Sequence, residues 1–111
     1  MQFDKAYSFL MQKLENDLPK NLYYHNASHT KDVLEYAQLL AESENVPEPE
    51  FTLIKTAALY HDAGYLEASK GHEEISCRIA RESLPGFGYA QEDIEAIAVQ
   101  IMAKKMPRPT H

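Results

Sequence analysis

A chain of 111 residues can bury one hydrophobic core but is too short for two, so we expect a single domain over residues 1–111. Its 44% apolar and 25% charged residues are typical of a globular protein, and no stretch approaches the roughly 20 apolar residues that cross a membrane. A net charge of −6 argues against capture of a nucleic-acid polymer or an anionic membrane by a basic surface.

The first segment has the spacing of an amphipathic helix, which we predict from about Phe3 to Asp17. The residues expected on its apolar side are Ala6, Phe9, Leu10 and Leu14. The segment carries acidic residues and has no small-residue cleavage site after an apolar block, so it does not resemble a signal peptide. The lone cysteine, Cys77, can form no internal disulfide and is best explained as a small apolar helix residue. Together these features favour a cytoplasmic protein.

A second helix is predicted from about Ser28 to Asn45, after a polar and aromatic turn that contains His25. Steps of three and four residues place a set of side chains on one face of this helix. That set is His29, Val33, Tyr36, Ala37 and Leu40. We therefore expect His29 to point inward. The segment VPEPE ends the helix, because two prolines within three residues cannot continue it.

The third helix, predicted from about Glu50 to Ala63, ends in an adjacent His-Asp pair. Its apolar stripe comprises Phe51, Ile54, Ala57, Ala58 and His61. Gly64 offers a C-terminal stop. His61 and Asp62 should thus lie at the end of a buried helix, where an ionised carboxylate is costly unless it is paired or coordinates a metal.

Two more helices are predicted, from about His72 to Leu84 and from about Gln91 to Lys104, with a Pro- and Gly-rich break between them. Because no segment alternates with a period of two, we expect an all-α fold, a compact bundle of about five helices. The apolar face of the last helix, around Ile97 and Ile101, would be uncovered if a following helix were missing. Such a face favours a homo-oligomer.

Each candidate site residue also has a structural explanation that involves neither catalysis nor metal binding. Alone, His61 is more often a satisfied core histidine, and Asp62 a polar residue at a helix end. His25, His29 and His72 could be turn or cap residues. Imidazole and carboxylate together, however, suit a divalent transition metal such as manganese, iron, zinc, nickel or cobalt, and the single cysteine disfavours a thiolate zinc site.

The ordered strings carry more information than any single residue. YHNASHTKDV is followed about thirty residues later by AALYHDAGY and then by GHEEIS. This pattern resembles the HD superfamily of metal-dependent phosphohydrolases, which is named after its His-Asp pair, and the resemblance covers the chain from about Leu22 onward. It implies that one or two divalent ions activate water to cleave a phosphoester of a small phosphorylated substrate, such as a nucleotide.

The resemblance also implies roles for particular residues. His29 corresponds to the first metal ligand, and His61 and Asp62 to the second and third, with Asp62 also in the catalytic set and able to bridge two ions. The YHN segment is similar to that of cyclic-nucleotide phosphodiesterases, which implies that His25 is the general acid for the leaving oxygen. His72, in its GHE context, is implied as a contact to a second metal or to the substrate phosphate.

Two further positions are less well defined. Lys104 is a candidate contact for the substrate phosphate, although a solvated helix end explains it more simply. The family completes its primary site with an aspartate on a later helix, and no residue here matches it. Asp93 is explained by the dipole of its helix.

The unmatched aspartate leaves two explanations of the chain open. The chain is either a piece that lacks C-terminal helices or a variant with an incomplete metal shell. An HD-type regulatory or ligand-binding module without catalysis is the main alternative to a hydrolase. A diiron oxygenase on the same scaffold is the other alternative, and it needs more histidine ligands.

Overall fold

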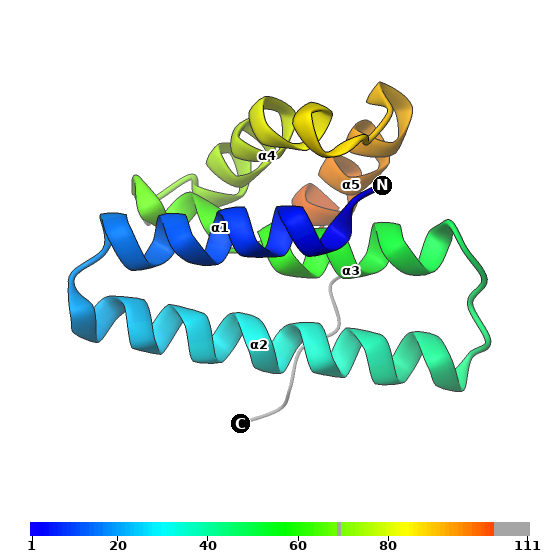
Figure 1. The fold of residues 1–111 in the computed structure, drawn as a ribbon, viewed down its shortest axis with the longest axis horizontal. Coiled ribbons are helices and arrows are strands. Elements are labelled where there is room, and N and C mark those ends of the chain that lie inside the picture. Colours follow the sequence, from blue (N-terminus) through cyan, green and yellow to red (C-terminus); the bar gives the residue numbers. More distant parts are fainter. Residues whose placement is uncertain (69, 104–111) are drawn as a thin grey trace.

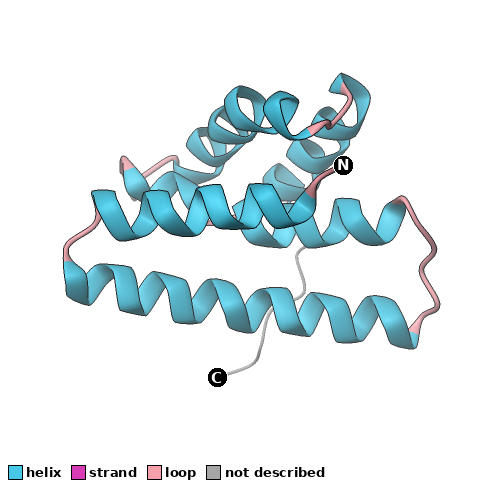
Figure 2. Ribbon diagram, viewed as in Figure 1, coloured by secondary structure: helices cyan, strands magenta, loops and turns pink. Residues whose placement is uncertain are grey.

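The structure, a computed structural model, describes residues 1–68 and 70–103. These residues form α1 (Phe3–Asp17), α2 (Lys20–Ser43), α3 (Glu50–Tyr60), the 3-10 helix η1 (Ala63–Leu66), α4 (His72–Ser83), the 3-10 helix η2 (Leu84–Phe87) and α5 (Gln91–Ala103). No strand occurs in this part of the chain, and loops join helices throughout (Figure 2). The predicted all-α class and the number of helices are confirmed.

Helix α3 lies at the centre of the fold. It packs against α2 on one side and against α4 and α5 on the other, and α1 runs alongside it (Figure 1). At its C-terminal end, Ala57, Ala58, Leu59 and Tyr60 are all buried, as expected for a helix that is covered on every side. The end of α3 therefore meets α2 and α4 inside the protein.

The polar groups of α3 are satisfied within the core. The buried hydroxyl of Thr56 donates to the carbonyl of Thr52 and lies 2.7 Å from the hydroxyl of Tyr89. The hydroxyl of Tyr60 lies 2.9 Å from Oγ of Ser83 on α4. Because a buried polar group without a partner is costly, these pairs help to fix α3 against α4 and the start of α5.

Helix α2 begins at Lys20, well before the predicted start near Ser28. Pro19 precedes its first residue, where a fixed φ favours helix initiation, and neither proline nor glycine interrupts the segment that follows. The side-chain amide of Asn26 donates to the carbonyl of Leu22 on the preceding turn. The predicted turn was therefore wrong, and His25 lies on the helix, one turn before His29.

The buried stripe of α2 is centred one residue further along than predicted. Val33 and Ala37 are buried as expected, together with Ala27, Thr30, Leu34 and Ala41. Tyr36 and Leu40, which were expected to point inward, are exposed because they lie at the edge of this stripe. His29 shares that edge, and its side chain remains 32% exposed. The side chain of His29 therefore lies at the rim of the core.

Phe9 on α1 is a similar correction. It was expected in the core with Ala6, Leu10 and Leu14, but only those three are buried. Phe9 lies at the surface, where its ring packs against Phe87 with 5.6 Å between the ring centroids. It covers η2 and does not enter the core.

Helix α3 ends at Tyr60, three residues before the predicted end, and Gly64 does not cap it. Gly64 lies within η1, where a Cβ atom would collide with the backbone carbonyl oxygen of His72. Glycine is needed here because the first residue of α4 packs directly on the chain. This close approach brings α4 against the segment that carries His61 and Asp62.

The C-terminal half follows the predicted pattern with smaller shifts. The break after α4 is the 3-10 helix η2, which ends at Gly88 in a left-handed conformation with φ of 80°. Lys104, the predicted end of the last helix and candidate phosphate contact, lies outside the described residues. Ile97 and Ile101 are buried in the core, so the expected uncovered face was wrong. Among the described residues of α5, the large exposed apolar side chains are Val99 and Met102.

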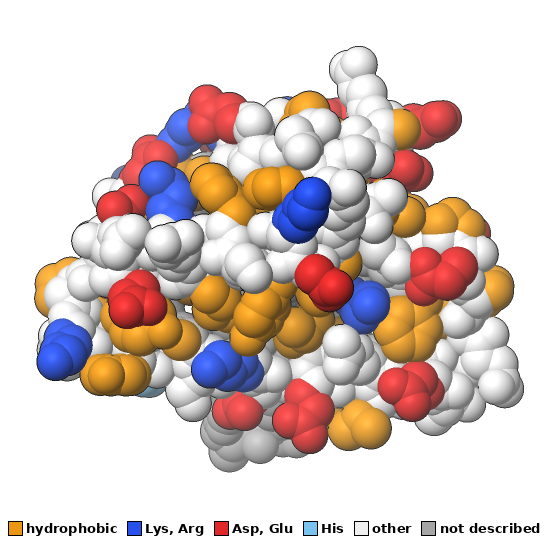
Figure 3. Space-filling view, in the orientation of Figure 1, with side chains coloured by type: hydrophobic (Ala, Val, Ile, Leu, Met, Phe, Trp, Pro, Cys, Tyr) orange, Lys and Arg blue, Asp and Glu red, His pale blue; other side chains and the backbone are white. Residues whose placement is uncertain are grey.

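The lone cysteine and the protein surface have ordinary features. Cys77 is buried and burial raises the pKa of its thiol, in agreement with the structural role predicted for it. Acidic and basic side chains are interspersed on the face shown in Figure 3, around an apolar seam between α1 and α2. Within the described residues, no helix combines the length and the apolar character that a membrane span requires.

Candidate metal centre

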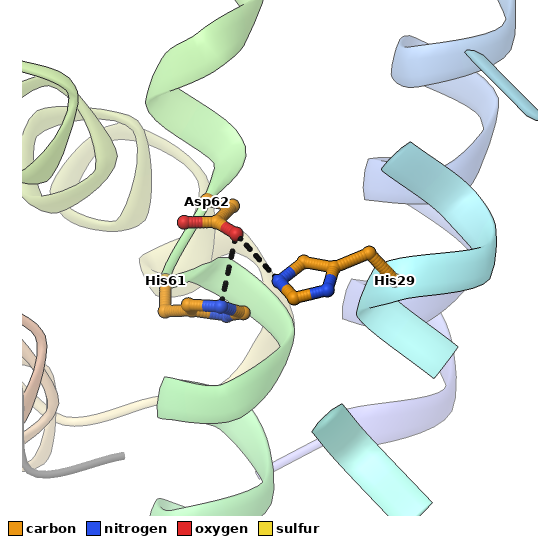
Figure 4. Close-up of side chains that lie close together, drawn as sticks. All are labelled: His29, His61 and Asp62. Atoms are coloured by element: carbon orange, nitrogen blue, oxygen red, sulfur yellow. Dashed lines mark ion pairs between the residues drawn. The ribbon is translucent and has the colours of Figure 1, made fainter. Parts of the chain in front are cut away.

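Three side chains from two parts of the chain converge beside the end of α3 (Figure 4). Nε2 of His29, on α2, lies 3.1 Å from Oδ2 of Asp62. Nε2 of His61 lies 3.0 Å from the same oxygen. One ligand atom from each residue lies within 4.8 Å of the others. The three residues predicted as metal ligands thus form one cluster.

The end of α3 makes this arrangement possible. Consecutive side chains on an α-helix point about 100° apart, so His61 and Asp62 would diverge if the helix continued. Instead, Asp62 adopts φ of −111° and ψ of 11°, outside the α-helical region. Its carboxylate lies over the ring of His61, and both side chains face His29 (Figure 4).

His61 is held in one tautomer by a carbonyl group of α3. Its ring is 2% exposed, and Nδ1 lies 2.7 Å from the carbonyl oxygen of Ala58. A carbonyl only accepts hydrogen bonds, so Nδ1 carries the hydrogen and, in the neutral ring, Nε2 carries a lone pair. That nitrogen is buried and has no hydrogen-bond partner, although it lies 3.0 Å from Oδ2 of Asp62. A ring oriented in this way through its other nitrogen is typical of metal-binding histidines.

Asp62 is ready to act as an anionic ligand. Burial by itself raises the pKa of this carboxyl, but the positive charge that the imidazoles of His61, His29 and His72 carry when protonated outweighs it, so the pKa of Asp62 is lowered. The side chain is 12% exposed. A partly buried carboxylate therefore faces two imidazole nitrogens.

His72 approaches the cluster from the other side. It is the first residue of α4, and its Nε2 lies 3.4 Å from Oδ1 of Asp62. Its Nδ1 lies 3.3 Å from Oε1 of Glu73, and its ring stacks on Tyr65 with 4.1 Å between the ring centroids. Asp62 thus directs one oxygen toward His29 and His61 and the other toward His72.

A pocket of about 380 Å³ opens beside the cluster. Its polar lining comes from His25, Asn26, His29 and Asp62, and its apolar lining from Leu18, Leu22 and Tyr65. His25 and His29 are four residues apart on α2, so both line the same side. The pocket has the size and the mixed lining of a small-molecule site.

The structure brings together some of the predicted site residues and separates others. His29, His61 and Asp62 cluster, His72 contacts Asp62, and His25 lines the adjacent pocket. Asp93 lies in the first turn of α5 and outside the cluster, in agreement with its assignment to the helix dipole.

Sequence reasoning gave no role to several residues that line the pocket or contact the cluster. Asn26 belongs to the YHN string, and Tyr65 follows Asp62 by three residues, so both stood next to recognised motifs. Leu18 and Leu22 gave no such signal, because they flank the junction that was read as a turn. The serine at position 76 was also missed, although it contacts the segment that carries Asp62.

The donor set fits a divalent transition metal. Two imidazole nitrogens and one carboxylate oxygen are ligands that zinc, iron, manganese and nickel accept in proteins. Two ligand atoms at about 2.1 Å from one ion and at right angles to each other are about 3.0 Å apart. The contacts of Asp62 with His61 and His29 are 3.0 and 3.1 Å, and all three ligand atoms lie within 4.8 Å of one another, so the group is compact enough to be a candidate for one ion.

Comparisons with known proteins identify the family of this chain. The sequence model of the family described as HD domain matches residues 26–109. An uncharacterised protein of Clostridium beijerinckii is 32% identical over 97 residues, which cover 85% of this chain. The chain spans 60% of the length of that curated relative. A search of solved structures gave no significant match.

The family match extends over most of the chain and includes the His-Asp pair. It begins one residue after His25, so the likeness of the YHN segment to cyclic-nucleotide phosphodiesterases stays a prediction. The chain therefore belongs to the HD domain family, which is typical of metal-dependent hydrolases.

Proposed function

We propose that this chain is a metal-dependent phosphohydrolase in which His29, His61 and Asp62 hold a divalent transition metal. The ion would be manganese, iron, zinc, nickel or cobalt, and the adjacent pocket would take a small phosphorylated substrate such as a nucleotide. The observation that carries the proposal is the convergence of two imidazole Nε2 atoms on Oδ2 of Asp62, at the wall of that pocket.

Each ligand has a distinct task in this proposal. Ala58 orients the ring of His61, so the buried Nε2 would be the atom that binds the ion. His29 brings the second nitrogen from α2, and Asp62 supplies the negative charge. A bound divalent ion lowers the pKa of a coordinated water toward about 7 and polarises a phosphoryl oxygen.

His25 would donate the proton that the leaving oxygen needs. It lines the pocket one turn before His29, and imidazole exchanges protons readily near neutral pH. General acid catalysis of this kind contributes about 10² to 10⁴ in rate. Asn26 lines the same pocket and offers an amide for contact with the substrate.

His72 would contact either a second ion or the substrate phosphate. Its Nε2 lies 3.4 Å from Oδ1 of Asp62, the oxygen that is turned away from His61. If a second ion were bound there, Asp62 would hold both ions. Lys104, the other candidate phosphate contact, remains a prediction because it lies outside the described residues.

One observation favours a second candidate function, an HD-type module that binds a ligand without hydrolysing it. The candidate metal group in the described part of the chain has three protein ligands, and Asp93 is not among them. A diiron oxygenase would need additional histidine ligands, and this group supplies two. The chain spans 60% of the relative's length, so the activity of the whole protein and its cytoplasmic location are proposals as well.

Metal analysis combined with hydrolysis of model esters tests the proposal. Protein purified without chelator should carry a transition metal and hydrolyse p-nitrophenyl phosphate or bis(p-nitrophenyl) phosphate. Asp62→Asn should lose both properties, whereas Asp93→Asn, a carboxylate outside the cluster, should keep them. Metal binding without hydrolysis of either ester would favour the ligand-binding module, and equal metal content in the two variants would reject the ligand set.

A further inference from the structure

The hydroxyl of Ser76 is held between two backbone groups that flank Asp62. Ser76 lies on α4, and its side chain is fully buried. Its Oγ accepts a hydrogen bond from the N–H of Gly64 at 2.7 Å and donates one to the carbonyl of His61 at 3.1 Å. A single side chain thus ties both ends of the segment that carries Asp62.

These backbone groups need a partner because α3 ends just before them. In a continuous α-helix the N–H of Gly64 would donate to the carbonyl four residues earlier, and the carbonyl of His61 would accept from the residue four positions later. That later residue, Tyr65, instead donates to the carbonyl of Asp62 at 3.1 Å. Ser76 supplies the hydrogen bonds that the end of the helix removes.

Helix α4 also touches this segment at two other points. The carbonyl of His72 packs so closely on Gly64 that no Cβ atom would fit there. Nε2 of His72 lies 3.4 Å from Oδ1 of Asp62. The position of the Asp62 carboxylate relative to His61 therefore depends on how α4 packs. Ser76 is the buried side chain of α4 that hydrogen-bonds the backbone on both sides of Asp62.

We propose that Ser76 is a positioning residue of the metal centre, which holds His61 and Asp62 at the separation that one ion requires. The inference rests on the proposed function, because the ligands it positions are those proposed above. Partners that orient metal ligands typically change metal affinity by 10- to 100-fold when they are replaced. We expect a loss of about this size when the hydroxyl is removed.

Cobalt titration of two serine variants tests the role of Ser76. Ser83→Ala is the matched control, because Ser83 also lies on α4 and its hydroxyl contacts Tyr60 and the carbonyl of Ile79, away from the Asp62 segment. Ser76→Ala should bind Co²⁺ about 10- to 100-fold more weakly than wild type and show an altered visible spectrum. Ser83→Ala should keep the wild-type affinity and spectrum even where its melting temperature falls.

Two results would overturn the inference while leaving the metal centre in place. One is an unchanged affinity and spectrum in Ser76→Ala, and the other is an equal loss in Ser83→Ala, which would show a general effect of stability. If the wild-type protein binds no Co²⁺, the proposed metal centre fails and the role of Ser76 falls with it.

A measurement on the wild-type protein covers the case in which Ser76→Ala does not fold. The amide of Gly64 should be protected from hydrogen exchange by its bond to Ser76. Zn²⁺ at about ten times its Kd should slow this exchange about tenfold further. Exchange of Gly64 at the rate of an open loop, or a rate that Zn²⁺ binding leaves unchanged, would overturn the inference.

Discussion

Nε2 of His29 on α2 lies 3.1 Å from Oδ2 of Asp62, which follows α3. His29 lies on α2 and Asp62 lies just after the end of α3, so the packing of α2 on α3 sets the distance between them. The candidate metal centre is therefore a property of the folded bundle, and a bound ion would link the two helices. Metal ligands and pocket residues can be separated experimentally, because His25 lines the pocket while His29 and His61 belong to the cluster.

The first prediction separates the general acid from the ligands. His25→Ala should retain the metal content of the wild-type protein and lower the turnover of a phosphodiester substrate by about 10² to 10⁴. His61→Ala should lose both metal and turnover, because it removes a buried ligand. Elemental analysis and steady-state kinetics of the two variants check this. Equal metal loss in both would make His25 a ligand, and unchanged turnover in His25→Ala would remove it from the mechanism.

The second prediction concerns the close approach of α4 to the metal segment. Gly64→Ala should destabilise the protein by about 3 kcal/mol or more, because the new methyl group meets a backbone carbonyl that cannot move alone. Gly86→Ala is the matched control, since a Cβ atom there meets open space and should stabilise the fold by about 0.4–1 kcal/mol. Urea denaturation of both variants measures the difference. Similar stability for the two would contradict the packing described for η1 and α4.

The third prediction is a loss of stability at high pH. Burial raises the pKa of Tyr60 from 10.0 to about 12, although its hydrogen bond with Ser83 opposes the shift. Between these values the unfolded chain loses the phenol proton while the folded protein keeps it, so stability falls as the pH rises from about 10 to about 12. Two pKa units correspond to about 3 kcal/mol, and below pH 10 this contribution is fully present.

Tyr60→Phe isolates this effect, because the variant removes the titrating group and keeps the ring. Its stability should fall less steeply than that of the wild-type protein between pH 10 and 12, as measured by urea denaturation at several pH values. Parallel curves for the two proteins would show that Tyr60 titrates normally in the folded state.

The sequence predicted the helices that have clear apolar periodicity and distinct ends. α1 was predicted with its observed bounds, because Pro19 follows it closely and its inner face repeats regularly. The start of α2 was missed because the aromatic and polar segment around His25 has no such periodicity. Its helical state depends on contacts of Ala27 and Thr30 with the rest of the protein, which local propensity does not encode.

Sequence motifs predicted the candidate site residues. Only the three-dimensional fold shows which contacts hold them together. The sequence indicated His29, His61 and Asp62 as ligands, but it assigned Gly64 to the end of the helix. The need for glycine arises from His72, eight positions further along, and no local pattern reports such a contact. The same holds for Ser76, whose two hydrogen bonds span 12 and 15 residues of sequence.

The most direct test of the metal centre is an NMR measurement of the histidine ring nitrogens during titration with Zn²⁺. Nε2 of His29 and Nε2 of His61 should move to metal-bound chemical shifts, while Nδ1 of His61 keeps its hydrogen through the bond to Ala58. The ring of His25 should show no coordination. Coordination through Nδ1 of His61, coordination by His25 in place of His29, or no coordinated ring at saturating Zn²⁺ would contradict the proposed centre.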